Sequence, residues 1–243
     1  MIEFGSGSLR SLPQVTKHLL IINIVLWLLT ILLQGTVDLT SLLGLHYYKG
    51  SDFNPLQLFT YMFMHSTQGL GHIFFNMFAL FMFGGLIERI VGSNRFLFYY
   101  IVCGLGAGLV QEVTWHYTLP SMVDSIGAAY GETDYYKTVI TQGLSLDPLY
   151  NELITVGASG AVFGLLLAVA FFLPDLQLYL FFIGPFKAKW LVLGYAIIEL
   201  LLGLGDFAWD NVAHFAHLGG MLFGFFVLLY WYRKNIGRHD RFY

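Results

Sequence analysis

The sequence predicts an all-α protein that crosses a membrane as a bundle of six helices. Of its 243 residues, 57% are hydrophobic and only 11% are charged, whereas about 25% of residues are charged in soluble domains. The mean hydropathy of +0.67 agrees with this composition. Six apolar segments also approach the length of about 20 residues that a helix needs to cross a bilayer. We therefore expect residues 1–243 to form a single polytopic membrane domain of six spans.

The spans are expected at about residues 18–35, 71–89, 96–114, 153–173, 189–204 and 212–232. The first follows Arg10 and Lys17 and could be mistaken for a signal peptide. However, the residues GTVDLTSLLG after it contain no small-x-small cleavage site, so we interpret it as a retained helix. The shorter apolar run from Leu176 to Ile183 is interpreted as an interfacial segment or as part of a turn.

The distribution of Lys and Arg predicts the orientation of the chain. If the N-terminus is cytoplasmic, the outer loops contain Lys49 and Lys137, and all the others of the 12 Lys and Arg residues lie on the cytoplasmic side. An excess of Lys and Arg is typical of cytoplasmic segments, so we expect both termini in the cytoplasm. The compact layout and the lack of a transit-type N-terminus favour a prokaryotic plasma membrane.

Two outer loops are long. Residues 36–70 are rich in Phe, Tyr and Leu, and we expect them to rest partly in the bilayer surface. Residues 115–152 contain several acidic side chains, and we expect a water-exposed loop there. No basic cluster indicates nucleic-acid binding, and the single cysteine, Cys103, cannot form an internal disulfide.

Three polar positions recur near the outer ends of the even-numbered spans. His72 lies near the start of the second span, and His72 and Asn76 share a helix face at i, i+4. Ser159 and His217 are each expected about six residues into their spans, which is roughly 9 Å below the outer boundary at a rise of 1.5 Å per residue. The sequence thus predicts that the three segments bring these groups into one layer.

Glycine pairs predict which spans pack closely. Gly160/Gly164 and Gly220/Gly224 are small-xxx-small pairs, which let helix backbones approach each other in lipid. We infer that the fourth span packs tightly against the sixth, as a contact between a serine and a histidine requires.

These residue types suit acyl-transfer chemistry. A serine hydroxyl becomes an effective nucleophile when a histidine accepts its proton, and the resulting oxyanion needs hydrogen-bond donors. Ser159 lies in the first turns of a helix, where free backbone N–H groups favour negative charge. Polar groups buried in a membrane are costly and are functional candidates by default. The pattern therefore indicates peptide-bond chemistry within a bilayer.

Three motifs resemble those of the rhomboid family of intramembrane serine proteases: HIFFN from His72 to Asn76, GASG from Gly157 to Gly160, and AHLGGMLFG from Ala216 to Gly224. The resemblance covers about residues 18–232. It implies a Ser–His dyad with Ser159 as nucleophile and His217 as general base and acid. It also implies His72, Asn76 and the Ser159 amide as oxyanion donors.

The resemblance implies further that Phe163 stacks on the His217 imidazole and that the fifth span, with Trp190 and Gly194, is a lateral gate. Expected substrates are transmembrane segments of membrane proteins, and no metal or organic cofactor is expected. Two features depart from the family pattern. The first outer loop reads NPLQLFTYMFMH without the Trp-Arg pair of many relatives, and the 115–152 loop is long and acidic.

Several residues have alternative interpretations. Ser159 alone could be a packing serine that bonds a carbonyl four residues earlier. His214 and His217 are spaced like metal ligands, but they have no acidic or cysteine neighbour in the sequence and no H-E-x-x-H motif, so we predict no metal site. We interpret His214 as a structural or interfacial histidine and His65 as structural.

Three acidic positions are also ambiguous. Gly203 to Asp206 mimics the GxGD motif of aspartyl proteases, whose chemistry needs a second, opposed aspartate. No second aspartate lies within a predicted span, so we interpret the match as accidental. Asp210 is an alternative third member of a triad with His217. Glu199, within the fifth span, needs a polar partner that the sequence does not identify. Two other functions remain open, namely a rhomboid-like membrane chaperone without protease activity and a small transporter or channel.

Overall fold

The computed structural model describes residues 12–179, 185–205 and 212–234. Within these residues, five helices are long and apolar enough to cross a membrane. They are α1 (Gln14–Leu32), the continuous run of α4 (Gly71–Ala79), η3 (Leu80–Gly84) and α5 (Gly85–Val91), α6 (Ser93–Ala128), α10 (Ala188–Gly205) and α11 (His214–Arg233). A shorter apolar helix, α9 (Ser159–Phe172), lies among them. The predicted all-α membrane fold is therefore confirmed.

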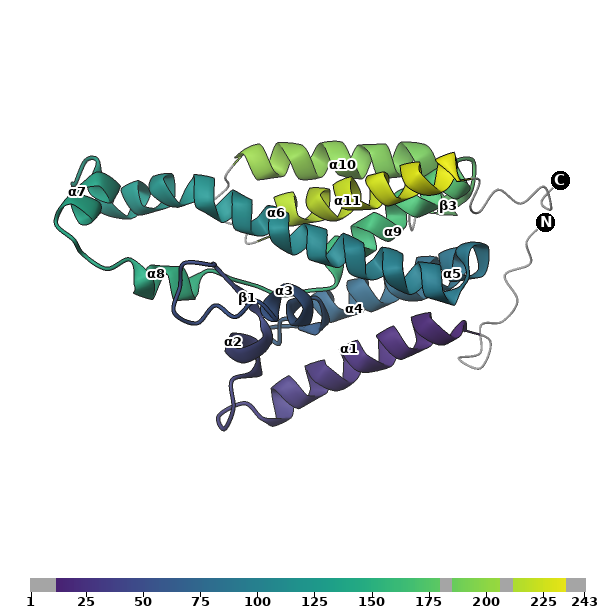
Figure 1. Ribbon diagram of the computed structural model, residues 1–243, viewed down its shortest axis with the longest axis horizontal. Coiled ribbons are helices and arrows are strands. Elements are labelled where there is room, and N and C mark those ends of the chain that lie inside the picture. The colour runs from purple at the N-terminus through teal and green to yellow at the C-terminus, as the bar shows by residue number, and fades with distance from the viewer. Residues whose placement is uncertain (1–11, 180–184, 206–211, 235–243) are drawn as a thin grey trace.

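The remaining elements connect these helices. They are α2 (Leu39–Leu43), β1 (Leu45–His46), α3 (Gln57–Thr60), η2 (Tyr61–Phe63), α7 (Tyr135–Thr141), α8 (Asp147–Glu152), β2 (Ile154–Thr155), β3 (Gln177–Tyr179) and β4 (Pro185–Lys187). The long helical passes alternate in direction, so α1 begins and α11 ends at the same end of the molecule, opposite α7 (Figure 1). Strands β3 and β4 pair in the antiparallel direction, and β3 lies in the apolar run from Leu176 that was expected to be an interfacial segment or part of a turn.

Helix α6 extends well beyond the span predicted at 96–114. It continues to Ala128, so the prediction of a loop over residues 115–152 was wrong for its first part. The reason is a buried stripe with helical spacing, which consists of Trp115, Leu119, Val123 and Gly127. Polar residues lie between the positions of this i, i+4 pattern, and they led to the prediction of a loop. Two further short helices, α7 and α8, follow it.

Helix α9 begins later than predicted. The fourth span was expected from residue 153, but residues 154 and 155 form strand β2, and the helix starts at Ser159. Ser159 therefore lies at the first residue of the helix rather than about six residues into it. Because α9 is surrounded by α6, α10, α11 and the α4–α5 run, most of its surface is buried by protein, and it need not reach across a bilayer by itself.

A small antiparallel sheet joins the first outer loop to the segment before Ser159. Strand β1 pairs with β2, with Leu45 opposite Thr155 and His46 opposite Ile154. The N–H of Gly157 also donates to the carbonyl of Tyr61 at 3.0 Å. Many apolar residues of this loop are buried against the protein, including Tyr47, Met62 and Met64, while Leu56 and Phe59 are exposed. The loop thus fixes the backbone that leads into α9.

At the opposite end of the bundle, Glu88 caps helix α1. Its carboxylate accepts hydrogen bonds from the N–H groups of Val15 and Thr16 and from the hydroxyls of Thr16 and Ser93, at 2.7–3.0 Å. The first N–H groups of a helix have no intrahelical acceptors. One buried side chain therefore satisfies the start of α1 and ties it to α5.

Replacement of Glu88 by alanine is expected to destabilise the protein by about 3 kcal/mol, because the two buried donors of Thr16 and the partly buried N–H of Val15 lose their acceptor together. Glu88→Gln should cost less, since the amide oxygen still accepts. Thermal unfolding of the purified variants in detergent measures the difference. Equal stability of Glu88→Ala and the wild type would contradict this account of the α1–α5 contact.

Candidate active site

Ser159 and His217 lie side by side although 58 positions separate them in the sequence. The Ser159 Oγ is 2.8 Å from the His217 Nε2, within hydrogen-bonding distance. Ser159 is the first residue of α9, and His217 is in the first turn of α11, where it is 8% exposed. Two helix starts at the same end of the bundle thus deliver a hydroxyl and an imidazole to one point.

Close packing of α9 against α11 makes this contact possible. A Cβ added to Gly220 would overlap the carbonyl of Gly160, so the two backbones touch at these glycines. One turn further along each helix, a Cβ on Gly164 would strike the Cys103 Sγ, and one on Gly224 would lie 2.5 Å from the Tyr99 hydroxyl. Gly160, Gly164 and Gly220 therefore lie at the α9–α11 interface that the sequence assigns to them, whereas Gly224 packs against α6.

The His217 ring is held by an aromatic contact as well. Phe163, one turn after Ser159 on α9, stacks on the imidazole with ring centroids 4.3 Å apart and planes 8° apart. The stacking limits rotation of the ring about its side-chain bonds. As a result, the Nε2 atom stays directed at the serine.

His72 faces the same small space from α4. Its Nδ1 accepts a hydrogen bond from the Ser66 N–H at 3.2 Å. In a neutral imidazole, an accepting Nδ1 leaves the proton on Nε2. A Cβ added to Gly157 would lie 2.9 Å from this Nε2 and 3.6 Å from the Ser159 Oγ. Gly157, with φ +135°, thus leaves open a space that the His72 N–H and Ser159 both border.

Asn76 is placed one turn after His72 and is buried. Its Nδ2 donates to the His72 carbonyl at 2.8 Å. An amide nitrogen has two hydrogens, so one remains for another acceptor. The contact that the structure gives Asn76 is therefore with its own helix rather than with Ser159.

His65 packs against His72, with ring centroids 5.1 Å apart. Burial lowers the pKa of His65 to about 3, and the neighbouring His72 lowers it as well. The folded protein therefore disfavours a protonated His65, whereas an unfolded chain protonates it below about pH 6.5.

Lowering the pH from 7 to 5 is expected to cost about 2 kcal/mol of stability through His65, because only the unfolded state takes up this proton in that interval. The contribution of His65 to stability is complete above the pKa that this side chain has in the unfolded chain, about 6.5, and it decreases as the pH falls below that value. Thermal unfolding of the wild type and of His65→Leu across this pH range tests the expectation. An equally steep pH dependence in both proteins would contradict it.

The sequence did not identify the partners of Glu199, and the structure does. The Glu199 Oε2 accepts hydrogen bonds from the Nδ1 of His217 at 2.9 Å and from the Nδ1 of His214 at 2.6 Å. No acid lies beside these histidines in the sequence, and the acid that contacts them comes from another helix, α10. A signal was present in the sequence, namely one acid in an apolar span that is followed by two histidines three residues apart.

Other sequence candidates fall elsewhere. Asp206 and Asp210 lie outside the described residues. Trp190 is 61% exposed on α10, and the space beside Gly194 is open, so the proposed gate helix has a largely uncovered surface.

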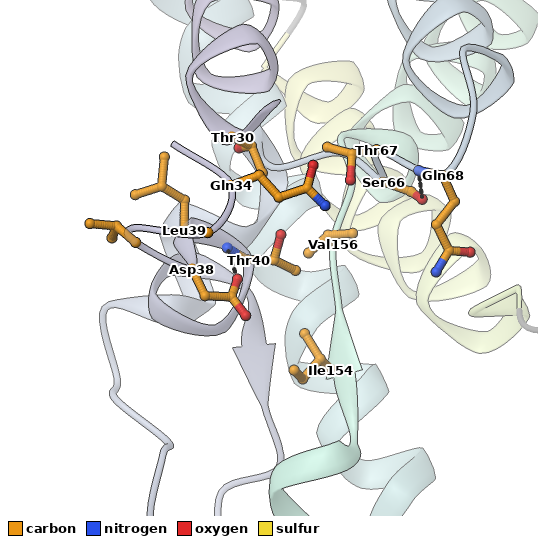
Figure 2. A pocket seen from close by; sticks show the side chains of 12 residues that line it. Thr30, Gln34, Asp38, Leu39, Thr40, Ser66, Thr67, Gln68, Ile154 and Val156 are labelled. Atoms are coloured by element: carbon orange, nitrogen blue, oxygen red, sulfur yellow. Dashed lines mark hydrogen bonds between the residues drawn. The ribbon is translucent and has the colours of Figure 1, made fainter. Parts of the chain in front are cut away.

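A cavity of about 410 Å³ opens beside the site between the end of α1, helix α2 and the segment that leads into α9. Figure 2 shows Gln34, Asp38, Ser66, Thr67 and Val156 among its lining residues. Neither Ser159 nor His217 contributes to this lining. We therefore assign the cavity no part in the chemistry.

Comparison with known proteins gives consistent matches. The family model for the Rhomboid domain matches residues 52–234. Rhomboid protease GluP of Bacillus subtilis (strain 168) is 26% identical over 161 residues, which is 65% of this chain but only 23% of GluP. The YdcA protein of the same strain, which carries a provisional rhomboid-protease name, is 27% identical over 235 residues, or 95% of this chain and 94% of YdcA. Because the family model covers most of the chain and all three motifs, this protein belongs to the rhomboid family.

Proposed function

We propose that this protein is an intramembrane serine protease that hydrolyses peptide bonds in or near transmembrane segments. The observation that carries the proposal is the 2.8 Å contact between the Ser159 Oγ and the His217 Nε2, made by two family motifs. Buried polar groups that converge in this way are costly in a membrane unless they serve a function.

In the first step, the Ser159 Oγ attacks the carbonyl carbon of the substrate while its proton passes to the His217 Nε2. The carbonyl oxygen becomes an oxyanion. We assign it to the space beside Gly157, where the His72 Nε2–H and the Ser159 amide can donate to it. The N-terminus of α9 adds a favourable dipole there. Asn76 supports the same space through its free amide hydrogen and through its bond to the His72 carbonyl.

In the second step, the tetrahedral intermediate collapses and His217 gives its proton to the departing amine. The acyl group is then bonded to Ser159. Water enters, gives a proton to His217 and attacks the ester, which releases the acid product and restores the serine. These steps require no metal or organic cofactor.

The protein is an integral membrane protein, and we propose that both termini are cytoplasmic, in a prokaryotic plasma membrane. The distribution of Lys and Arg supports this orientation. The start of α1 and the end of α11 at one end of the molecule also fit it (Figure 1). The active site then lies just below the outer surface, where water can reach it.

The expected substrates are transmembrane proteins with small or helix-breaking residues near the cleaved bond. A helical peptide bond is shielded by its own hydrogen bonds and side chains, so the substrate must unwind before Ser159 can attack it. Substrates with a glycine or proline near the site should need less energy to unwind.

The test is cleavage of a panel of single-span substrates by the purified wild type and by Ser159→Ala, both reconstituted in lipid vesicles. Cleavage by the wild type alone is the expected result. A folded wild type that cleaves no member of the panel and does not react with fluorophosphonates would favour the chaperone function. Substrate flux that survives both Ser159→Ala and His217→Ala would favour a transporter.

A further inference from the structure

Helix α10 is mostly uncovered, but its one acidic residue is buried. Glu199 is 8% exposed, while its neighbours Ile198 and Leu200 are 51% and 44% exposed. The buried residues of α10 are Ala188, Val192 and Glu199, which share one face at spacings of four and seven. The side of α10 that meets the bundle therefore carries a carboxylate, which is costly in a membrane unless it has partners.

The partners of Glu199 are the two histidines in the first turn of α11. Figure 1 shows α10 running alongside α11, and the Oε2 atom of Glu199 accepts from both Nδ1 atoms, at 2.9 Å for His217 and 2.6 Å for His214. With an ionised carboxylate as acceptor, each Nδ1 must carry a hydrogen. Both histidines thus contact the same oxygen of the carboxylate.

This arrangement selects the useful tautomer of His217. When Nδ1 carries the hydrogen, the neutral ring has a free lone pair on Nε2, which is the atom 2.8 Å from the Ser159 Oγ. A general base for serine needs this tautomer. After Nε2 takes the serine proton, the imidazolium remains next to a negative carboxylate, which stabilises its charge.

We propose that Glu199 is the positioning residue of a Ser159–His217–Glu199 triad and that His214 fixes the carboxylate in place. The inference rests on the proposed protease function and deepens it, because the family resemblance implies a dyad without an acid. Glu199 acts through His217 and does not touch the substrate.

The same three side chains could also be considered as metal ligands, since their ligand atoms lie within 4.8 Å of one another. Two ligands of one tetrahedral zinc ion, each about 2.0–2.1 Å from the metal, lie roughly 3.3 Å apart. The Glu199 oxygen is closer than this to both nitrogens. These separations are those of hydrogen bonds, and they favour the triad.

Glu199→Gln and Glu199→Ala, compared in purified protein in lipid vesicles, separate a positioning role from a packing role. The glutamine keeps the volume but can donate to Nδ1, which stabilises the wrong tautomer. We expect both variants to lower kcat by about 10²–10⁴-fold with KM changed less than about threefold. His214→Ala should have a smaller effect, about 10-fold. Leu222→Ala, at an exposed position of α11 that is 48% exposed, is the matched control and should retain wild-type turnover.

A measurement independent of turnover keeps the inference testable if the protease function fails. Proton NMR of protein with ¹⁵N-labelled histidine should show a strongly downfield Nδ1–H resonance for His217, assigned by its loss in His217→Ala. The resonance should disappear in Glu199→Gln. Thermal unfolding of this variant checks that it is folded.

Unchanged kcat in Glu199→Gln, or a wild type without that resonance, would overturn the triad. One tightly bound zinc per chain that is lost in Glu199→Ala would also overturn it, in favour of a metal site. Absence of Ser159-dependent cleavage in a wild type that shows the resonance would contradict the protease function alone.

Discussion

Alanine at position 159 or at position 217 is expected to reduce peptide hydrolysis by about 10⁴-fold or more. Ser159→Ala removes the nucleophile, and His217→Ala removes the group that accepts its proton. Because the two side chains act as one unit, the double variant should be hardly less active than either single variant. The measurement is the single-turnover rate of cleavage of a transmembrane substrate by each purified variant.

The control for this prediction is a variant that keeps the packing of both helices. Ser159→Cys keeps a nucleophilic side chain of similar size at this position, whereas alanine removes the nucleophile. Thermal unfolding of each variant reports whether α9 and α11 remain packed. Additive losses in the double variant would mean that the two residues act separately. A cleavage rate within tenfold of wild type in either alanine variant would contradict their assigned roles.

Alanine at position 72 or at position 76 is expected to lower kcat by about 10²–10³-fold, with a smaller effect on KM, because an oxyanion donor acts mainly in the transition state. The His72 Nε2–H borders the space beside Gly157, and Asn76 donates to the carbonyl of His72. We therefore expect the loss in His72→Ala to be direct and that in Asn76→Ala to come partly through the placement of His72.

The matched control is Phe75→Ala, because Phe75 lies on the same helix but is 60% exposed. Its kcat and KM should stay near those of the wild type. Steady-state kinetics of the three variants with one substrate give both parameters. If His72→Ala and Asn76→Ala both keep wild-type kcat, neither residue belongs to the oxyanion site.

The fold class and the helices could be predicted from the sequence because apolar runs of spanning length are a direct signal in a membrane protein. Boundaries were harder. Residues 153–156 are mostly apolar and read as part of a span, but Ile154 and Thr155 pair with a strand from a distant loop. Such pairing is a tertiary contact, so hydrophobicity cannot reveal it. The extension of α6 was hidden in a similar way by polar residues between its buried positions.

The site residues on α4, α9 and α11 could be named from motif spacing, whereas their hydrogen-bond partners could not. The tautomer of His72 depends on the backbone N–H of Ser66 in a loop. The role of Glu199 depends on how α10 is rotated about its axis relative to α11, and the apolar residues around it permit several rotations. A sequence shows that a buried acid needs a partner, but only the packed helices identify which one.

The central claim is that the imidazole of His217 activates the hydroxyl of Ser159. A fluorophosphonate probe reacts with serines activated in this way, and intact-mass and peptide mass spectrometry locate the modified residue. The account predicts a single adduct on Ser159 in the folded wild type, and its loss in His217→Ala and in Ser159→Ala. A folded wild type that stays unmodified, or a probe adduct on Ser159 that forms equally fast in His217→Ala, would contradict it.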